Sequence, residues 1–201
     1  MHVTDELEVA GRRLTIAHPP DPVELIDEEA FDRDEFLPYW AELWPSSLAL
    51  ARAVDALRPA GLAVVELGCG LALPSIVAAL GGARVLATDW SSEALAYVER
   101  NARANGADLE TALAVWAAAD ALVARGPFDL VLAADVLYEP RNAAQLLELL
   151  PRLGGDVLLA DPGRPALHGF LAAAKADWHV DATPAEEVPR GGLYRLARRV
   201  T

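Results

Sequence analysis

The stretch "VVELGCGLALPS" (residues 64–75) leads from an apolar strand through a turn with two glycines into an apolar helix. Gly68 and Gly70 allow the backbone to turn sharply and to approach a ligand, toward which the helix directs its free N–H groups. A dinucleotide-binding turn would have its third glycine at position 73, where this chain has Leu73. No G-K-[ST] follows, so the turn is not a P-loop. The turn therefore predicts a nucleotide-like ligand other than a dinucleotide.

Two acidic residues accompany this turn. Glu66 precedes the glycines, where a carboxylate does nothing for a pyrophosphate but suits a cationic ligand. Asp89 ends the next apolar segment, 19 residues after Gly70, where a carboxylate can bind two ribose hydroxyls. Asp89 could instead cap the helix that begins near Ser91, and both roles are possible.

Alternating apolar segments predict the fold. Strands are expected over 63–67, 84–88, 111–115, 128–134, 155–160, 176–182 and 192–199, and helices over 72–80, 91–105, 117–124, 141–150 and 166–175. Strands that alternate with helices form right-handed crossovers and a mostly parallel sheet covered on both faces. The last two strands have no helix between them and should form an antiparallel hairpin. We therefore predict an α/β, Rossmann-like, doubly wound seven-stranded sheet that is mostly parallel and ends in this hairpin.

An N-terminal extension over residues 1–58 is expected to precede a core over 59–201, the two forming one structural domain. The extension would contain a small hairpin over 7–16, a Pro-rich acidic surface excursion over 17–36, and a helix that starts at Pro45. Trp40 and Trp44 are four residues apart, a spacing that on one helical face favours a core position for Trp40. For Trp44, core and functional roles are equally open.

The composition is that of a globular protein, with 53% hydrophobic and 23% charged residues. Its 17 basic and 30 acidic side chains give a net charge of −13, which argues against nucleic acid as a partner. Cys69 is the only cysteine, so an internal disulfide is impossible and a reducing compartment is expected. The N-terminus does not read as a signal peptide, and no segment has the roughly 18 apolar residues of a membrane span. We expect a cytoplasmic protein without a membrane partner and, because the histidines are scattered, without a metal site.

The segment "VVELGCGLALPSIVAALGGARVLATDW" (64–90) resembles the S-adenosylmethionine site of class I methyltransferases, whose seven-stranded sheet ends in the same hairpin. Ala72 departs from the third glycine that is usual in that pattern. The resemblance implies that Glu66 lies near the methionine end of the cofactor and that Asp89 holds the ribose. It also implies cofactor contacts along the glycine turn and beside the adenine, at Gly68, Cys69, Gly70 and Trp90.

Three further stretches resemble methyltransferase family 16, which includes lysine methyltransferases that act on proteins. They are "LPYWAELWPSSLALA" (37–51), "AVWAAAD" (114–120) and "FDLVLAADVLYEP" (128–140). The features that mark the family are Trp44–Pro45, Trp116 and the D-x-x-Y motif from Asp135 to Tyr138. The resemblance adds Trp44, Trp116 and Ala134 to the cofactor contacts, although Trp116 could instead be ordinary packing.

One more stretch, "LLADPGRPAL" (158–167), resembles bacterial members of that family near the electron-transfer-flavoprotein β-subunit lysine methyltransferases. Asp161 and Arg164 within it either shape the acceptor entrance or form an Asp-Pro-Gly turn with a surface arginine. The two readings are equally open.

Two residues of the D-x-x-Y motif are the catalytic candidates. An amine must lose a proton before it attacks a methyl group, and a neighbouring carboxylate opposes that loss by raising the pKa of the amine. We therefore expect Asp135 to capture and orient the amine, with the proton leaving to water, unless Asp135 only caps the helix near residue 140. Tyr138 could accept a hydrogen bond, form part of a narrow channel, or simply pack.

The sequence thus predicts methyl transfer from S-adenosylmethionine to an amine, with a protein lysine as the preferred acceptor. The negative net charge fits a cationic acceptor but would also serve solubility alone. One alternative is a small-molecule N- or O-methyltransferase on the same scaffold. A second is a non-catalytic cofactor-binding module. A nicotinamide-dependent oxidoreductase is disfavoured by Leu73 and by the terminal hairpin.

Overall fold

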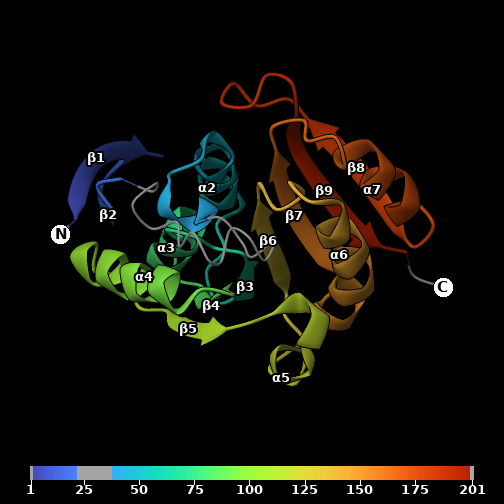
Figure 1. Cartoon of the computed structure of the whole chain (residues 1–201), viewed down its shortest axis with the longest axis horizontal. Coiled ribbons are helices and arrows are strands. Elements are labelled where there is room, and N and C mark those ends of the chain that lie inside the picture. The colour runs from blue at the N-terminus through green and yellow to red at the C-terminus, as the bar shows by residue number, and fades with distance from the viewer. Residues whose placement is uncertain (1, 22–37, 200–201) are drawn as a thin grey trace.

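The computed structural model describes residues 2–21 and 38–199 (Figure 1). Most of the predicted acidic excursion over 17–36 lies outside the described residues. Within residues 2–21 and 38–199, every helix is too short or too polar to span a bilayer.

The described residues form a seven-stranded sheet in the order β5-β4-β3-β6-β7-β9-β8. Its strands are β3 (Ala63–Leu67), β4 (Arg84–Asp89), β5 (Glu110–Leu113), β6 (Leu130–Ala134), β7 (Asp156–Asp161), β8 (Trp178–Thr183) and β9 (Gly192–Arg198). The first five strands pair in parallel, and β9 pairs antiparallel with both β7 and β8. The predicted doubly wound sheet with a terminal antiparallel hairpin is confirmed.

Helices cover both faces of the sheet (Figure 1). Those on one face are α2 (Pro45–Leu57), α3 (Leu73–Leu80) and α4 (Ser92–Ala104), and those on the other are α5 (Asp120–Val123), α6 (Pro140–Leu153) and α7 (Leu167–Ala174). Side chains along a strand alternate between these two layers. In β3, Val64 packs in the core beneath α2 and α3, whereas Val65 packs in the core beneath α6 and α7. Burial on both faces explains why the central strands are continuous apolar runs.

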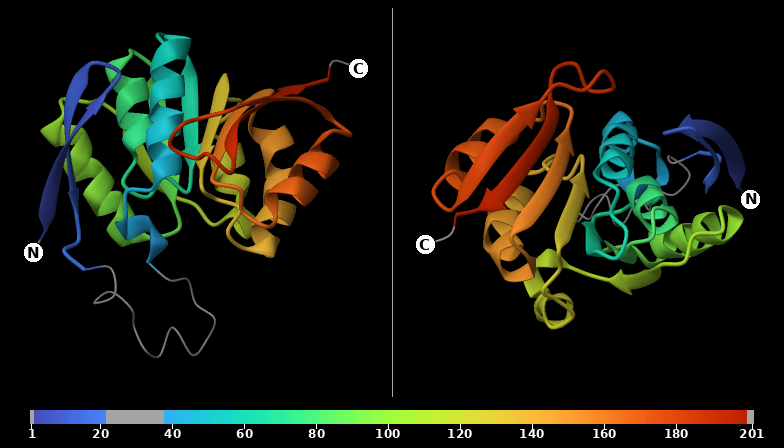
Figure 2. Two further views of the ribbon diagram at one scale, coloured as in Figure 1. Left: turned by 90° about the horizontal axis from the view of Figure 1, so that it is seen from above. Right: turned by 180° about the vertical axis from the view of Figure 1, so that it is seen from behind.

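An N-terminal hairpin of β1 (Val3–Val9) and β2 (Arg12–His18) lies beside α4, at the end of the molecule opposite β8 and β9 (Figure 2). It is longer than the predicted hairpin over 7–16. Two asparagines accept hydrogen bonds from the edge of β2. Oδ1 of Asn101, in α4, accepts from the backbone N–H of Ala17 at 2.8 Å. Oδ1 of Asn105, the C-cap residue of α4, accepts from the backbone N–H of Thr15 at 2.9 Å. These contacts align β2 with α4, a tie that hydrophobic periodicity does not reveal.

The region around Trp116 departs from the predicted boundaries. Strand β5 ends at Leu113, earlier than the predicted residue 115, because Leu113 pairs with Asp89, the last residue of its one neighbour, β4. The predicted helix over 117–124 is instead a 3₁₀ turn (η3, Trp116–Ala118) followed by the four-residue α5. The predicted strand over 128–134 begins only at Leu130, because Phe128 donates its N–H to Leu153 outside the ladder.

The helical reading of the Trp40–Trp44 spacing is wrong. Trp40 lies in a 3₁₀ turn (η2, Tyr39–Ala41), and Trp44 is the extended residue that precedes Pro45 at the start of α2. Pro45 fits the first helical position, where its missing N–H costs nothing, so the helix cannot be extended backward through Trp44. The core placement of Trp40 is nevertheless confirmed, because this side chain is buried and packs against Tyr97 with ring centroids 5.6 Å apart.

Candidate active site

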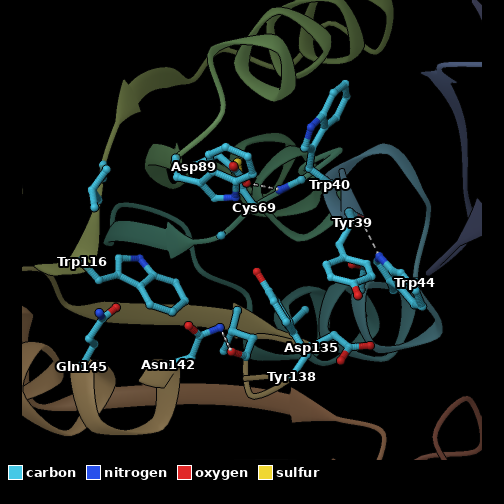
Figure 3. A pocket seen from close by; sticks show the side chains of 18 of the residues that line it. Tyr39, Trp40, Trp44, Cys69, Asp89, Trp116, Asp135, Tyr138, Asn142 and Gln145 are labelled. Atoms are coloured by element: carbon cyan, nitrogen blue, oxygen red, sulfur yellow. Dashed lines mark hydrogen bonds between the residues drawn. The ribbon is translucent and has the colours of Figure 1, made fainter. Parts of the chain in front are cut away.

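A pocket of about 400 Å³ opens where the central strands β3, β4 and β6 end. Ligands of open α/β sheets bind at this carboxyl edge. Figure 3 shows Asp89 and Trp116 toward one side of the pocket and Tyr39 and Trp44 toward the other, with the phenol of Tyr138 between them. The predicted site residues that line the pocket are Trp44, Gly68, Cys69, Gly70, Asp89, Trp90, Trp116, Ala134, Asp135 and Tyr138.

The glycine turn between β3 and α3 forms the floor of this pocket. Gly68 and Gly70 have φ values of +61° and +51°, a left-handed conformation that glycine adopts without strain. A Cβ on Gly68 would lie 3.3 Å from Cγ1 of Val136 and 3.4 Å from the Trp116 ring, and so would enter the space between two pocket walls. Ala72, in place of the expected third glycine, also has a positive φ of 59°. The backbone at this position therefore has the left-handed conformation typical of glycine, although the residue is an alanine.

Asp89 stands at the end of β4 and contacts the glycine turn directly. Its Oδ2 accepts the N–H of Gly70 at 3.0 Å, and its Oδ1 accepts the N–H of Ser91 at 3.0 Å. The side chain both lines the pocket and supports the start of α4, while Ser91 itself caps that helix through Ala94. Burial raises the pKa of Asp89 above its usual value, and the backbone N–H groups oppose this shift. A carboxylate that is held in this way keeps acceptor capacity toward the pocket.

Glu66 is the one predicted cofactor residue that does not line the pocket. Its Oε2 accepts from the backbone N and the Oγ of Ser75, at 2.9 and 2.5 Å, so the carboxyl group reaches the first turn of α3. Burial raises the pKa of Glu66 to about 8, and the Ser75 hydrogen bonds only partly offset this effect. At neutral pH Glu66 is therefore mostly protonated and ties β3 to α3.

Four tryptophans line different parts of the pocket. Trp116 forms a wall beside Gly68, and Trp90 packs in a small cluster with Trp40 next to Asp89. Trp44 is on the opposite side, where its Nε1 donates to the carbonyl of Tyr39 at 2.7 Å. The aromatic residues predicted as one cofactor set thus divide between two ends of the pocket.

Asp135 follows β6 with a φ of +56°, an unusual value outside glycine that aspartate tolerates better than most residues. Its Oδ1 accepts from Nε of Arg164 at 2.7 Å, and its Oδ2 lies 3.5 Å from Oγ of Ser46 in α2. The N-cap residue of α6 is Glu139, so Asp135 does not cap that helix. The strained backbone turns a buried carboxylate into the pocket, and such strain is characteristic of functional positions.

Tyr138 stands beside Tyr39, with ring centroids 5.1 Å apart. Burial raises the pKa of Tyr138 to about 12, so its hydroxyl stays protonated at neutral pH and can donate a hydrogen bond. Asn142 in the first turn of α6 donates from Nδ2 to the carbonyl of Val136 at 2.9 Å and thereby holds the D-x-x-Y turn. Sequence reasoning missed Asn142 and Tyr39. A buried asparagine on the apolar face of α6 was the one available signal for the first.

The "DPGR" segment begins at Asp161, the last residue of β7, and forms the predicted Asp-Pro-Gly turn, with its arginine at the pocket. Oδ1 of Asp161 accepts from the backbone N–H groups of Gly163 and Arg164, each at 2.7 Å, which makes an aspartate-capped turn. The turn directs the Arg164 side chain to Asp135 and over the Trp44 ring, at 5.7 Å from the ring centre. Arg164 lines the pocket, whereas Asp161 lies behind it and positions it.

The sequence profile described as lysine methyltransferase, family 16, matches residues 40–159. The chain belongs to methyltransferase family 16. It is 34% identical over 139 residues to the electron transfer flavoprotein beta subunit lysine methyltransferase of Xenopus laevis, covering 63% of this chain and 53% of that protein. It is 30% identical over 171 residues to the mouse EEF1A lysine methyltransferase 3, covering 79% and 72%.

The fold agrees with this assignment. The Thermus thermophilus 16S rRNA N2 G1207 methyltransferase, solved with AdoMet and guanosine, superposes with a TM-score of 0.72 at 15% identity, covering 99% of this chain and 51% of that one. The chain spans about half the length of the first curated relatives that it matches.

S-adenosylmethionine is the methyl donor of this class of enzyme, and the pocket suits it. The side-chain-free turn at Gly68 leaves room that a Cβ would fill, and the Asp89 carboxylate faces the same space. Within this frame, Asp89 would hold the ribose and the Trp116 ring would form a wall for the base.

Proposed function

We propose that this chain transfers a methyl group from S-adenosylmethionine to the side-chain amine of a lysine on a protein. The observation that carries the proposal is the buried carboxylate of Asp135, which shares the pocket with the phenol of Tyr138 at its middle and with Tyr39 and Trp44 on the side away from Trp116. Carboxylates and aromatic faces recognise amines and their cations. Two relatives that are named lysine methyltransferases support the same class of acceptor.

When bound, the donor supplies an electrophilic methyl carbon on a sulfonium, which an amine lone pair attacks as the carbon–sulfur bond breaks. The task of the protein is to align the amine with the methyl carbon. Asp135 accepts an N–H of the amine and fixes its direction. The protonated hydroxyl of Tyr138 narrows the approach and can donate a hydrogen bond, and the proton of the amine leaves to water.

The charge of the whole chain supports a cationic partner rather than a nucleic acid. A net charge of −13 attracts lysine-rich protein surfaces and opposes a phosphate backbone. The proposed setting is the cytoplasm, where the single buried thiol of Cys69 would remain reduced.

The proposal is tested by incubating the purified chain with tritiated S-adenosylmethionine and a bacterial lysate separated into protein and small-molecule fractions. We expect label in a protein band, recovered after digestion as methylated lysine. An Asp135→Asn variant should label that band weakly, and an Asp181→Asn variant, altered on the exposed face of β8, should label it like the wild type.

Other outcomes each select a different function. Label confined to the small-molecule fraction would make the chain a small-molecule methyltransferase. Label on a protein residue other than lysine would overturn the acceptor. Binding of S-adenosylhomocysteine without any label would favour a non-catalytic module.

A further inference from the structure

Arg164 lies against the carboxylate that we assign to the acceptor. Its Nε donates to Oδ1 of Asp135 at 2.7 Å, and its Cζ lies 5.7 Å from the centre of the Trp44 ring. A carboxylate beside an aromatic face is an environment that binds cations. A guanidinium of the chain itself therefore already bonds to one oxygen of that carboxylate.

Several contacts hold Arg164 in this position. Its backbone N–H is fixed by Oδ1 of Asp161 at 2.7 Å, and its side chain is fixed by Asp135 and the Trp44 ring. The side chains of Arg164 and Asp135 are 33% and 6% exposed, so the carboxylate is buried while the arginine is partly exposed. The hydrogen bond to Asp135 raises the pKa of Arg164 further above its already high value, and the guanidinium remains charged. The pair is a built part of the site.

The charge of this pair bears directly on methyl transfer. Only a neutral amine has the lone pair that attacks the methyl carbon, and a bare carboxylate beside it would favour the ammonium form. We propose that Arg164 neutralises Asp135, so that the site orients the acceptor amine without holding it as an ammonium ion. Arg164 is then a positioning residue that acts through Asp135 and determines which protonation state of the acceptor the site accepts.

Other ionisable groups surround the pair. Those that line the pocket or interact with its residues are Tyr39 and Glu42 before α2, Cys69 in the glycine turn, Asp89 at the end of β4, Tyr138 and Glu139 after β6, Arg141 in α6, and Asp161 at the end of β7. Arg164 provides the guanidinium that bonds to Asp135, and Arg141 pairs with Glu139. Removal of Arg164 therefore shifts the local balance strongly toward negative charge.

This inference rests on the proposed function, and its first test does not need turnover. The complex of the full chain with S-adenosylhomocysteine is titrated with n-butylamine, the side-chain amine of lysine without its backbone, by ligand-observed NMR at pH 7. The unpaired Asp135 of an Arg164→Gln variant should bind butylammonium about tenfold more tightly than the wild type. Arg164→Lys, which keeps a cation, should resemble the wild type. Arg52→Gln, which removes an exposed arginine of α2 paired with Glu187, is the matched control.

The second test uses tritiated S-adenosylmethionine and a pool of lysine-centred peptides. Arg164→Gln should lose about tenfold in kcat at pH 7 and recover toward the wild type near pH 10, where the bound amine deprotonates. Its affinity for S-adenosylhomocysteine should remain unchanged.

Three results would overturn the inference. The first is unchanged or weaker butylammonium binding by Arg164→Gln. The second is a pH–rate profile identical to that of the wild type. The third is a faster variant at pH 7, which would make Arg164 a plug that the acceptor displaces. If no peptide is labelled by the wild type, the proposed function fails on these acceptors while the butylamine titration still decides the role of Arg164.

Discussion

The two ends of the pocket are built in different ways. The end that we propose for the cofactor, around the glycine turn and Asp89, is made of neighbouring segments, with Asp89 bonded to the backbone of Gly70 and Ser91 and with Glu66 bonded to Ser75. The end that we propose for the acceptor, around Asp135, is assembled from distant segments, because Asp135 contacts Arg164, 29 residues away, and Ser46, 89 residues away. These are called the cofactor end and the acceptor end below. Asp89 accepts from backbone N–H groups, whereas Asp135 is held by the side chains of Arg164 and Ser46.

This difference separates the expected effects of mutation. Changes at the cofactor end should weaken donor binding, because they disturb the turn that receives it. Changes at the acceptor end should slow transfer while leaving donor affinity intact, because no backbone turn of the cofactor end depends on them. Each of the following experiments tests whether donor binding and methyl transfer are affected separately in this way.

The largest effect is expected for Asp89→Ala. Losing two charge-assisted hydrogen bonds to a ribose, at about 1.5–3 kcal/mol each, should weaken S-adenosylhomocysteine binding by about 100-fold or more. Isothermal titration calorimetry measures this affinity, with Asp181→Ala on β8 as the matched control. Affinity within a few-fold of the wild type would remove Asp89 from the cofactor site.

Asp135→Asn should show the opposite pattern. Asparagine tolerates the positive φ of this position, so the backbone turn should survive, but the charge that pairs with Arg164 is lost. We expect turnover to fall by about 30-fold, or about 2 kcal/mol, the order of one lost hydrogen bond to a charged group, with donor affinity within about twofold. The comparison would break if donor affinity fell as much as turnover.

Trp116→Ala tests how much the aromatic wall contributes to donor affinity. The indole forms a pocket wall beside Gly68, and losing an aromatic face of this kind is worth about 1 kcal/mol, or about fivefold in affinity for S-adenosylhomocysteine. Trp116→Phe should retain most of the affinity because it keeps a ring. Equal affinity in all three proteins would leave Trp116 as ordinary packing.

Glu66→Gln should change how the stability of the protein depends on pH. Of these substitutions, it should alter ligand affinity least. Below pH 4.5 Glu66 is protonated in both the folded and the unfolded chain, and between pH 4.5 and about 8 only the folded chain keeps the proton. Glu66 therefore lowers stability as pH rises through this window, by at most about 1.4 kcal/mol per pH unit. Glutamine resembles the protonated form and should remove that slope.

Urea unfolding of the wild type and Glu66→Gln at several pH values between 5 and 8 measures this slope. Glu148→Gln, an exposed glutamate of α6, should unfold with the pH dependence of the wild type. If Glu66→Gln also matched the wild type, Glu66 would be ionised in the folded protein.

The geometry around the glycine turn could be predicted from the sequence because its determinants are local. Two glycines after an apolar strand and an aspartate at the end of the next one lie within one strand–helix–strand unit, and parallel pairing of β3 with β4 brings them together. Even Ala72 follows this logic, since the turn imposes a positive φ on whatever residue stands there.

The acceptor end could be predicted only in part. The D-x-x-Y motif located Asp135 and Tyr138, but their partners depend on which loops meet above the sheet. The packing of Tyr39 on Tyr138 and the Arg164–Asp135 pair join segments whose spacing carries no periodic signal. Trp40 and Trp44 show the same limit. Their spacing of four residues suggests one face of a helix, but the segment contains a 3₁₀ turn and an extended residue.

The most direct test of the account is a crystal structure of the chain with S-adenosylhomocysteine. We expect both ribose hydroxyls within hydrogen-bond distance of the Asp89 carboxylate, the sulfur directed toward Asp135 and Tyr138, and the glycine turn beneath the ligand. A ribose bound away from Asp89, or a sulfur that faces Trp116 instead of Asp135, would contradict it.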